Sequence, residues 1–399
     1  MKFRLSVAEL SGAFADLGVL LPLTLSLITL NHLNATAAFA GIGLAYLVTA
    51  FAYRLPIPVQ PLKSLSATAL ALGLSPLVIV AGAWWMTLFF VLLALTPSAR
   101  RIERLFPTPI VRGIQLGLGF LLLQSAWGLV TKPILSIMPG AAGPLLIALG
   151  AGFVLVIALR FWRDAAALAV ISFGIVLALI YGGTQTIPSD ALGIVWPTFN
   201  RGLPAPGDFW TALWLLALPQ LPLSMANSVY STTDAARQYF DEEASHVTPR
   251  RLLSTMTINN ALAALLGGVP VCHGCGGLTA HYRLGARTGA APLILGMISL
   301  GLAILGGRAI LSLLALIPFP ALGILLAYVG LQHAWLAKDL RGWRAWLSAL
   351  SVALVTLLTR NLALGFAVGA GTYFSLQRCR RMNGASLRVS RFSGRPFSG

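Results

Sequence analysis

Long apolar segments separated by short polar connections occupy almost all of the 399-residue sequence. A membrane-spanning helix needs about 20 mostly apolar residues, and most of these segments approach or reach that length. The pattern predicts an all-α polytopic membrane protein with about fourteen transmembrane segments. The predicted segments are residues 8–31, 35–53, 61–74, 76–95, 108–130, 143–161, 164–183, 209–231, 251–267, 270–281, 289–306, 309–329, 343–358 and 360–377.

Two of these segments are short, and each adjoins a stretch rich in proline or glycine, at residues 58–64 (PVQPLKS) and 267–277 (GGVPVCHGCGG). Broken hydrophobic segments at matching positions of two halves indicate the substrate site of a transporter. Non-helical backbone at membrane depth must be buried in protein or line a cavity. We therefore expect residues 55–60 and 267–272 to be extended, with Pro61 at the start of the first short helix. Ordinary proline kinks in longer helices would also produce this pattern.

The longest polar connection, residues 184–208, divides the chain into two halves of seven segments each, at residues 1–183 and 209–378. An odd number of spans per half inverts the second half relative to the first. The layout therefore predicts a 7+7 inverted repeat, with the substrate site near the middle of the bilayer. Residues 379–399, rich in Arg, Ser and Gly, are expected to form a short disordered basic tail.

The composition agrees with a membrane protein, because 57% of the residues are apolar and only 10% are charged, against about 25% in soluble proteins. The net charge of +17 comes from Lys and Arg in alternate connections. This positive-inside pattern predicts cytoplasmic N- and C-termini in a cytoplasmic membrane, and it argues against a nucleic-acid partner. The first apolar run contains Asp16 and Pro22, so it is interpreted as a membrane helix rather than a signal peptide.

Ionisable side chains within membrane segments are costly and are functional candidates. Lys63 lies near the start of the first short helix, where the helix dipole does not favour a cation. An anionic partner is therefore expected, either the substrate or a carboxylate such as Asp16 or Asp234. A lysine that extends to the cytosolic surface would also fit this position. Asp16 itself could carry a coupling proton, pair with Lys63 or cap a broken helix, and pairing is favoured.

The second half carries further polar candidates. Gln220 and Asn227, with Ser224 and Ser231, form a stripe at helical spacing that favours a cavity-lining face. His273 lies in the second break, where it could donate to an anion or exchange a proton.

Cys272 and Cys275 flank His273 in a C-x-x-C pattern. This spacing is shared by thiol-redox and zinc motifs. No second pair of Cys or His completes a zinc site, so we expect no metal or cofactor and favour tight packing of small residues beside a substrate.

The motifs around these residues resemble the molybdate transporter family related to the SulP anion transporters. The resemblance rests on the sequence at residues 15–23, 58–64, 227–240 and 271–287, which includes His-Gly-x-Gly-Gly followed by Tyr-Arg and Gly-Ala-Arg. Two positions depart from the family pattern: Leu62 replaces a usual methionine, and Cys275 replaces a usual alanine.

The resemblance implies a fold shared with uracil permeases, in which a core domain (spans 1–4 and 8–11) moves against a gate domain (spans 5–7 and 12–14). It implies a transporter rather than an enzyme, without the cytosolic STAS domain of SulP proteins. Molybdate is the expected substrate, with sulfate as the nearest rival. A proton co-substrate and a homodimer are the further partners to expect. A nucleobase permease of the same fold and a membrane thiol-redox protein are competing hypotheses.

A tetrahedral dianion is held best by N–H donors in a dry pocket, and two opposed helix N-termini provide such donors. The residues expected to surround the substrate are Gln60, Pro61, Lys63, Ser64, Gln220, Asn227, Cys272, His273, Gly274, Cys275 and Gly276.

Overall fold

The computed structural model describes residues 3–14, 16–96, 107–131, 143–162, 166–180, 194–195, 202–283, 285–305 and 316–392. Nearly all of these residues are helical, and the predicted all-α fold is confirmed. The elements are α1 (Val7–Phe14), α2 (Leu17–Leu30), α3 (Ala35–Tyr53), β1 (Gln60–Pro61), α4 (Lys63–Leu72), α5 (Pro76–Leu95), α7 (Thr108–Val130), α8 (Pro144–Phe161), α9 (Ala166–Ile180), α10 (Pro206–Ala212), η3 (Leu213–Ala217), α11 (Leu218–Leu223), η4 (Ser224–Ser231), α12 (Thr232–Phe240), η5 (Asp241–Ala244), α13 (Pro249–Leu266), β2 (Val271–Cys272), α14 (Cys275–Arg283), α15 (Ala290–Leu305), α17 (Phe319–Trp335), η6 (Leu336–Asp339), α18 (Trp343–Thr359) and α19 (Leu362–Phe392).

Within the described residues, six helices are long and apolar enough to cross a bilayer, or seven if the bent pair α1–α2 counts as one span. Three further apolar helices are shorter. The count of fourteen spans stays a prediction. Most of the connection at residues 184–208, and the first part of the span predicted at 309–329, lie outside the described residues. In the described part, the corresponding helix α17 begins at Phe319.

One sequence of elements occurs twice. In the first half, α3 begins at an Asn34 cap and ends at Arg54, whose left-handed backbone has a φ of 52°. In the second half, α13 begins at a Thr248 cap and ends at Gly267, with a φ of 75°. Each left-handed residue ends the helix and turns the chain into an extended segment, a two-residue strand and a short helix. This recurrence agrees with the two-repeat layout expected from the sequence.

The two strands cross and pair with each other in antiparallel register. Gln60 lies opposite Cys272, and Pro61 lies opposite Val271. The Leu62 N–H continues the pairing by donating to the Pro270 carbonyl at 2.9 Å. The expected extended backbone before each short helix is therefore present. The prediction that Pro61 starts the first helix is wrong, because Pro61 belongs to the strand and α4 begins two residues later.

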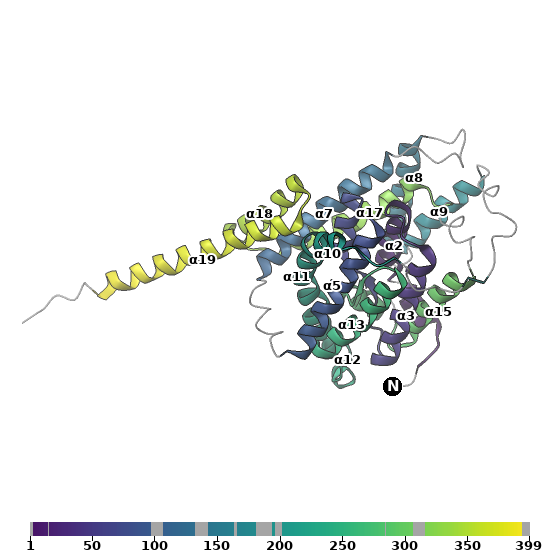
Figure 1. The fold of residues 1–399 in the computed structure, drawn as a ribbon, viewed down its shortest axis with the longest axis horizontal. Helices are drawn as coiled ribbons and strands as arrows, with labels where there is room; N and C mark the ends of the chain where they lie inside the picture. Colours follow the sequence, from purple (N-terminus) through teal and green to yellow (C-terminus); the bar gives the residue numbers. More distant parts are fainter. Residues whose placement is uncertain are drawn as a thin grey trace, which may run out of the picture.

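Most of the helices form one compact body, in which the labelled helices α2, α3, α5, α7, α13 and α17 lie together (Figure 1). Within it, helices α3, α13 and α15 pack together, and α7 packs on α17, α18 and α19. The close approach of α7 and α17 requires Gly119, where a Cβ would lie 2.7 Å from the Gly330 carbonyl oxygen. Helix α19 extends away from the body and continues to Phe392 (Figure 1). The tail expected to be disordered is therefore helical as far as that residue, because a helix already nucleated in α19 extends at low cost.

Candidate anion-binding site

The N-termini of α4 and α14 lie on either side of the strand crossing. The first helical bonds are donated by Ser66 to the Leu62 carbonyl (2.8 Å) and by Leu278 to the Gly274 carbonyl (3.2 Å). The N–H groups before these positions have no partner within their own helix. Lys63 and Ser64 in α4, and residues 275–277 in α14, therefore offer backbone donors at the positive ends of two helix dipoles. This arrangement favours an anion.

Side chains at the two N-termini add to this donor set. Ser64 is buried, and its hydroxyl has no hydrogen-bond partner among the described groups. Gly276 is exposed, and a Cβ added to it would meet nothing within 4 Å. A buried hydroxyl without a partner is costly.

Lys63 is half-buried, and no described carboxylate lies within 4 Å of its ammonium group. The salt bridges that the sequence suggested, to Asp16 or Asp234, are therefore absent. Asp234 is exposed on α12, so it does not supply a buried counter-charge for Lys63. Lys63 is the first residue of α4, two residues after the end of β1, which pairs with β2, and α14 begins three residues after β2. Its positive charge is thus located near the start of α14, where it would help to neutralise a bound anion.

Asp16 is almost completely buried and lies between α1 and α2. Its carboxylate accepts hydrogen bonds from the Tyr46 hydroxyl, at 2.5 Å, and from the Gln60 side-chain amide. The other end of the Gln60 amide, its oxygen, has no hydrogen-bond partner among the described groups and lies close to Gly274, within 2.3 Å of the position that a Cβ would take there. Pairing, the role favoured for Asp16 from the sequence, is observed, but with Tyr46 and Gln60 rather than with Lys63.

His273 is fully buried in the second break, but its ring is bound within the protein. Nδ1 lies 2.9 Å from the Pro58 carbonyl oxygen, and Nε2 lies 2.8 Å from the Thr255 hydroxyl. The ring also packs edge-on against Tyr53. Both ring nitrogens are therefore engaged in joining the two extended segments to α13. The sequence suggested that the ring donates a hydrogen bond to an anion, and this geometry does not match that role.

The polar side chains of the eighth predicted span, residues 209–231, do not all have the same kind of environment. Gln220 accepts from the Leu65 N–H at 3.0 Å and donates to Ser224 at 2.9 Å, so it caps α4 instead of presenting a free amide. Asn227 is half-buried, and its amide nitrogen lies 3.8 Å from the Cβ position of Gly274. It lies on η4, a π-helical turn, and such turns are frequent at functional sites. Ser231 is exposed.

Cys272 and Cys275 are free thiols in the structure. Cys272 is buried in β2 beside Ser228, and Cys275 is half-buried at the first turn of α14 beside Thr279. Among the described residues, no group of three or more His, Cys, Asp or Glu side chains is arranged to hold a metal ion. Both cysteines are small side chains that pack beside the strand crossing.

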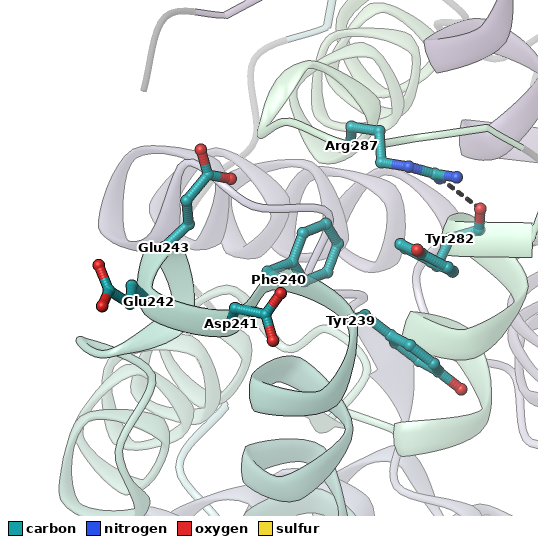
Figure 2. Close-up of a pocket in the computed structure, with 7 residues that line it drawn as sticks. All are labelled: Tyr239, Phe240, Asp241, Glu242, Glu243, Tyr282 and Arg287. Carbon is teal, nitrogen blue, oxygen red and sulfur yellow. Dashed lines mark hydrogen bonds between the residues drawn. The ribbon is translucent and has the colours of Figure 1, made fainter.

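A separate pocket of about 450 Å³ lies at the other end of α14 (Figure 2). Its walls include stacked rings of Tyr239 and Tyr282, 4.5 Å apart, with Arg287 above Tyr282. Three carboxylates, from Asp241, Glu242 and Glu243, complete the lining. This concentration of negative charge disfavours an oxyanion, so the strand crossing is the better candidate for an anion site.

The sequence analysis missed residues that support the site from a distance. Asn260 on α13 donates to the Val271 carbonyl (2.7 Å) and accepts from the Val271 N–H (3.1 Å), which fixes β2. Tyr46 holds Asp16 and Thr255 holds His273. Asn260, Tyr46 and Thr255 are polar residues inside predicted apolar spans, and that position was the signal available in the sequence.

Comparisons with known proteins show the family and the fold of this chain. The family model described as "Molybdate transporter of MFS superfamily" matches residues 8–122 and 212–332. "Molybdate transporter 2" of Arabidopsis thaliana is 29% identical, covering 93% of this chain and 87% of that protein. "Molybdate transporter 1" of Chlamydomonas reinhardtii is 28% identical, covering 92% of this chain and 90% of that protein.

Solved structures show the same fold at low identity. The transmembrane domain of the cyanobacterial bicarbonate transporter BicA aligns with a TM-score of 0.64 and 18% identity, covering 94% of this chain and 98% of that one. The murine Solute Carrier 26 family member A9 anion transporter, in its inward-facing state, aligns with a TM-score of 0.66 and 12% identity, covering 95% and 70%. Because the family model matches more than half of the sequence, this chain belongs to the molybdate transporter family.

Proposed function

We propose that this protein is a secondary transporter that takes up molybdate across the cytoplasmic membrane, with both termini in the cytoplasm and with protons as the coupling ion. The names of its relatives support the substrate. The concentration of Lys and Arg in alternate connections supports the orientation.

One observation carries the proposal: two helix N-termini lie on either side of a buried strand crossing, and among the described residues their first N–H groups have no partner within the helix and the hydroxyl of Ser64 has none at all. Donors of this kind suit a tetrahedral dianion, because they supply hydrogen bonds from fixed directions without adding a permanent counter-charge. The positive charge of Lys63 near α14 acts in the same direction.

Transport would follow from movement of a core domain, formed by spans 1–4 and 8–11, against a gate domain formed by spans 5–7 and 12–14. The site residues of β1, α4, β2 and α14 all belong to the core in this division. The anion would therefore move with the core, while helices such as α7 and α17 form the surface against which it slides.

The test is binding of molybdate, tungstate, sulfate and uracil to the purified protein, measured by thermal shift and calorimetry. We expect molybdate and tungstate to bind more tightly than sulfate, and uracil not to bind. Preference for sulfate would make the protein a sulfate carrier, and uracil binding alone would make it a nucleobase permease.

A matched pair of variants tests the location. Ser64→Ala removes a hydroxyl donor to a charged ligand, a loss of about 1.5–3 kcal/mol, or roughly a 10- to 150-fold weaker affinity. Ser66→Ala removes a hydroxyl that is also buried and unpartnered, but two residues further along α4 and on another side of the helix. It should leave molybdate binding unchanged. Equal effects of the two substitutions would move the site away from the N-terminus of α4.

A further inference from the structure

His281 and Asp16 form a buried pair next to the proposed anion site. His281 is completely buried in the last turn of α14, and neither of its ring nitrogens has a hydrogen-bond partner among the described groups. Its Nε2 lies 3.8 Å from Oδ2 of Asp16. A buried imidazole without partners is costly, and proximity to a buried carboxylate gives it a group with which to exchange a proton.

Asp16 connects this pair to the anion site through Gln60. With the carboxylate ionised, the Gln60 nitrogen donates to Asp16 and the Gln60 oxygen is left without a partner beside Gly274. An amide oxygen in that position is an acceptor and repels an anion. If Asp16 carries a proton, its hydroxyl can donate to the Gln60 oxygen. The amide then turns over, and its NH₂ group faces the region of Gly274 as a donor.

The neighbouring glycine shows how closely α14 packs on this network. A Cβ on Gly277 would lie 2.6 Å from the Gln60 nitrogen and 2.8 Å from Oδ1 of Asp16. His281 follows Gly277 by four residues, so both lie on the same face of the helix. Asp16, Gln60 and His281 are therefore held against one face of the helix whose N-terminus belongs to the anion site.

We infer that Asp16 is the binding site of the co-transported proton, that its protonation turns the Gln60 amide into an anion donor, and that His281 receives the proton when the anion leaves. The inference rests on the proposed function and names its coupling site. The proton enters from water and binds the Asp16 carboxylate as molybdate binds. On release, it passes from Asp16 to His281 Nε2, forming an imidazolium, and then to water at the Arg283 end of α14.

Other titratable groups around the pair are accounted for. The Glu9 carboxylate accepts from the N–H groups of Arg287 and Thr288, at 2.9 Å each. Arg283 is exposed, and the Arg287 guanidinium donates to the Tyr282 carbonyl. Further titratable groups on adjoining elements include Tyr46, which donates to Asp16; Lys63, at the start of α4; His273, bound to Pro58 and Thr255; and Cys275 and Tyr282 on α14. Helix α12, which packs on α14, adds Asp234 and Arg237, both exposed, and Tyr239, whose hydroxyl lies 3.1 Å from that of Thr279.

The sign of the pH dependence follows from the scheme. Protonation of Asp16 favours anion binding, so molybdate affinity should be highest at low pH. For one proton taken up with each anion, the affinity should fall by at most about tenfold for each unit by which the pH rises. Calorimetry of the intact protein with molybdate, in buffers of different ionisation enthalpy between about pH 6 and pH 8, counts the protons taken up. We expect one proton per molybdate.

Asp16→Asn mimics the protonated carboxyl, because its NH₂ group can donate to the Gln60 oxygen. We expect this variant to bind molybdate with an affinity independent of pH, and without proton uptake. Glu9→Gln, at the other buried carboxylate of the N-terminal segment, is the matched control and should keep both the wild-type pH dependence and the proton count. His281→Gln should keep the count of one proton but slow proton-driven uptake into liposomes.

The outcomes separate the inference from the function on which it rests. Molybdate binding by the wild-type protein without proton uptake overturns the inference and leaves the transporter intact. This measurement needs no variant, so it decides the matter even if Asp16→Asn fails to fold. Proton uptake that persists in Asp16→Asn, or disappears in His281→Gln, overturns the assignment of the two residues. A wild-type protein that does not bind molybdate overturns the proposed function itself.

Discussion

Gly276→Ala separates anion binding from folding more cleanly than other substitutions at the site. Gly276 is the second residue of α14, is exposed, and has open space around the position of its missing Cβ. Alanine in a helix is more favourable than glycine by about 0.5–1 kcal/mol. The substitution should therefore leave the thermal stability of the ligand-free protein unchanged or slightly higher.

The effect on molybdate should be the opposite. If the anion binds the N–H groups of α14, the new methyl group occupies space that the anion needs. Loss of one hydrogen bond to a charged ligand costs about 1.5–3 kcal/mol, which corresponds to a Kd roughly 10- to 150-fold higher. Calorimetry with molybdate measures this directly, and thermal unfolding without ligand verifies that the fold is intact.

Two glycine variants complete the experiment. Gly152→Ala on α8 also adds a methyl group with no neighbour within 4 Å, but far along the chain from the site, and should leave the Kd unchanged. Gly277→Ala drives a Cβ to within 2.8 Å of Asp16 and Pro58, and overpacking of this kind costs about 1–3 kcal/mol of stability. An unchanged molybdate affinity in Gly276→Ala would refute the assignment of the α14 N-terminus to the anion.

Two further predictions concern the support of the site and the cysteines. Asn260→Ala leaves the N–H and carbonyl of Val271 without partners, at about 1–3 kcal/mol for each buried group. We expect a clear fall in the melting temperature in detergent, and an unchanged value would show that β2 is fixed by other contacts. The double variant Cys272→Ala, Cys275→Ala should retain molybdate transport, because neither thiol has a redox partner or a metal site among the described residues. Complete loss of transport in a folded double variant would favour the thiol-redox hypothesis instead.

Much of the architecture could be predicted from the sequence, because hydrophobic length and proline or glycine breaks act locally. The breaks at residues 58–64 and 267–277 identified both short helices and the extended backbone before each of them. The pairing of Gln60 with Cys272 could not be obtained in this way. It joins residues that are distant in the chain, and two-residue strands leave no periodic pattern in the sequence.

The roles of individual side chains were harder to predict, because a polar residue in a membrane segment signals only that some partner exists. His273 and Gln220 were predicted to surround the substrate; both are buried, and their partners in the structure include Pro58, Thr255 and Leu65. Burial requires such groups to be satisfied, and the sequence does not reveal whether protein or ligand satisfies them. The orientation of the side chain, which depends on tertiary contacts, decides whether its partner is the protein or a ligand.

This distinction explains why the groups left for the anion are mainly backbone N–H groups. Gln220 and His273 are engaged by the protein, whereas Lys63 and Ser64 have no such partner among the described residues. Backbone donors at the start of a helix are fixed in direction by the helix itself, so they can bind an anion without reorganising. The charged side chains near these donors are Lys63 and Asp16. In the proposed scheme a proton on Asp16 neutralises its carboxylate, so the net charge of the occupied site depends on whether that proton is present. Under the proposed scheme, an anion held in this way is bound while Asp16 carries the proton and is released when the proton leaves, which a permanent pair of arginines would not allow.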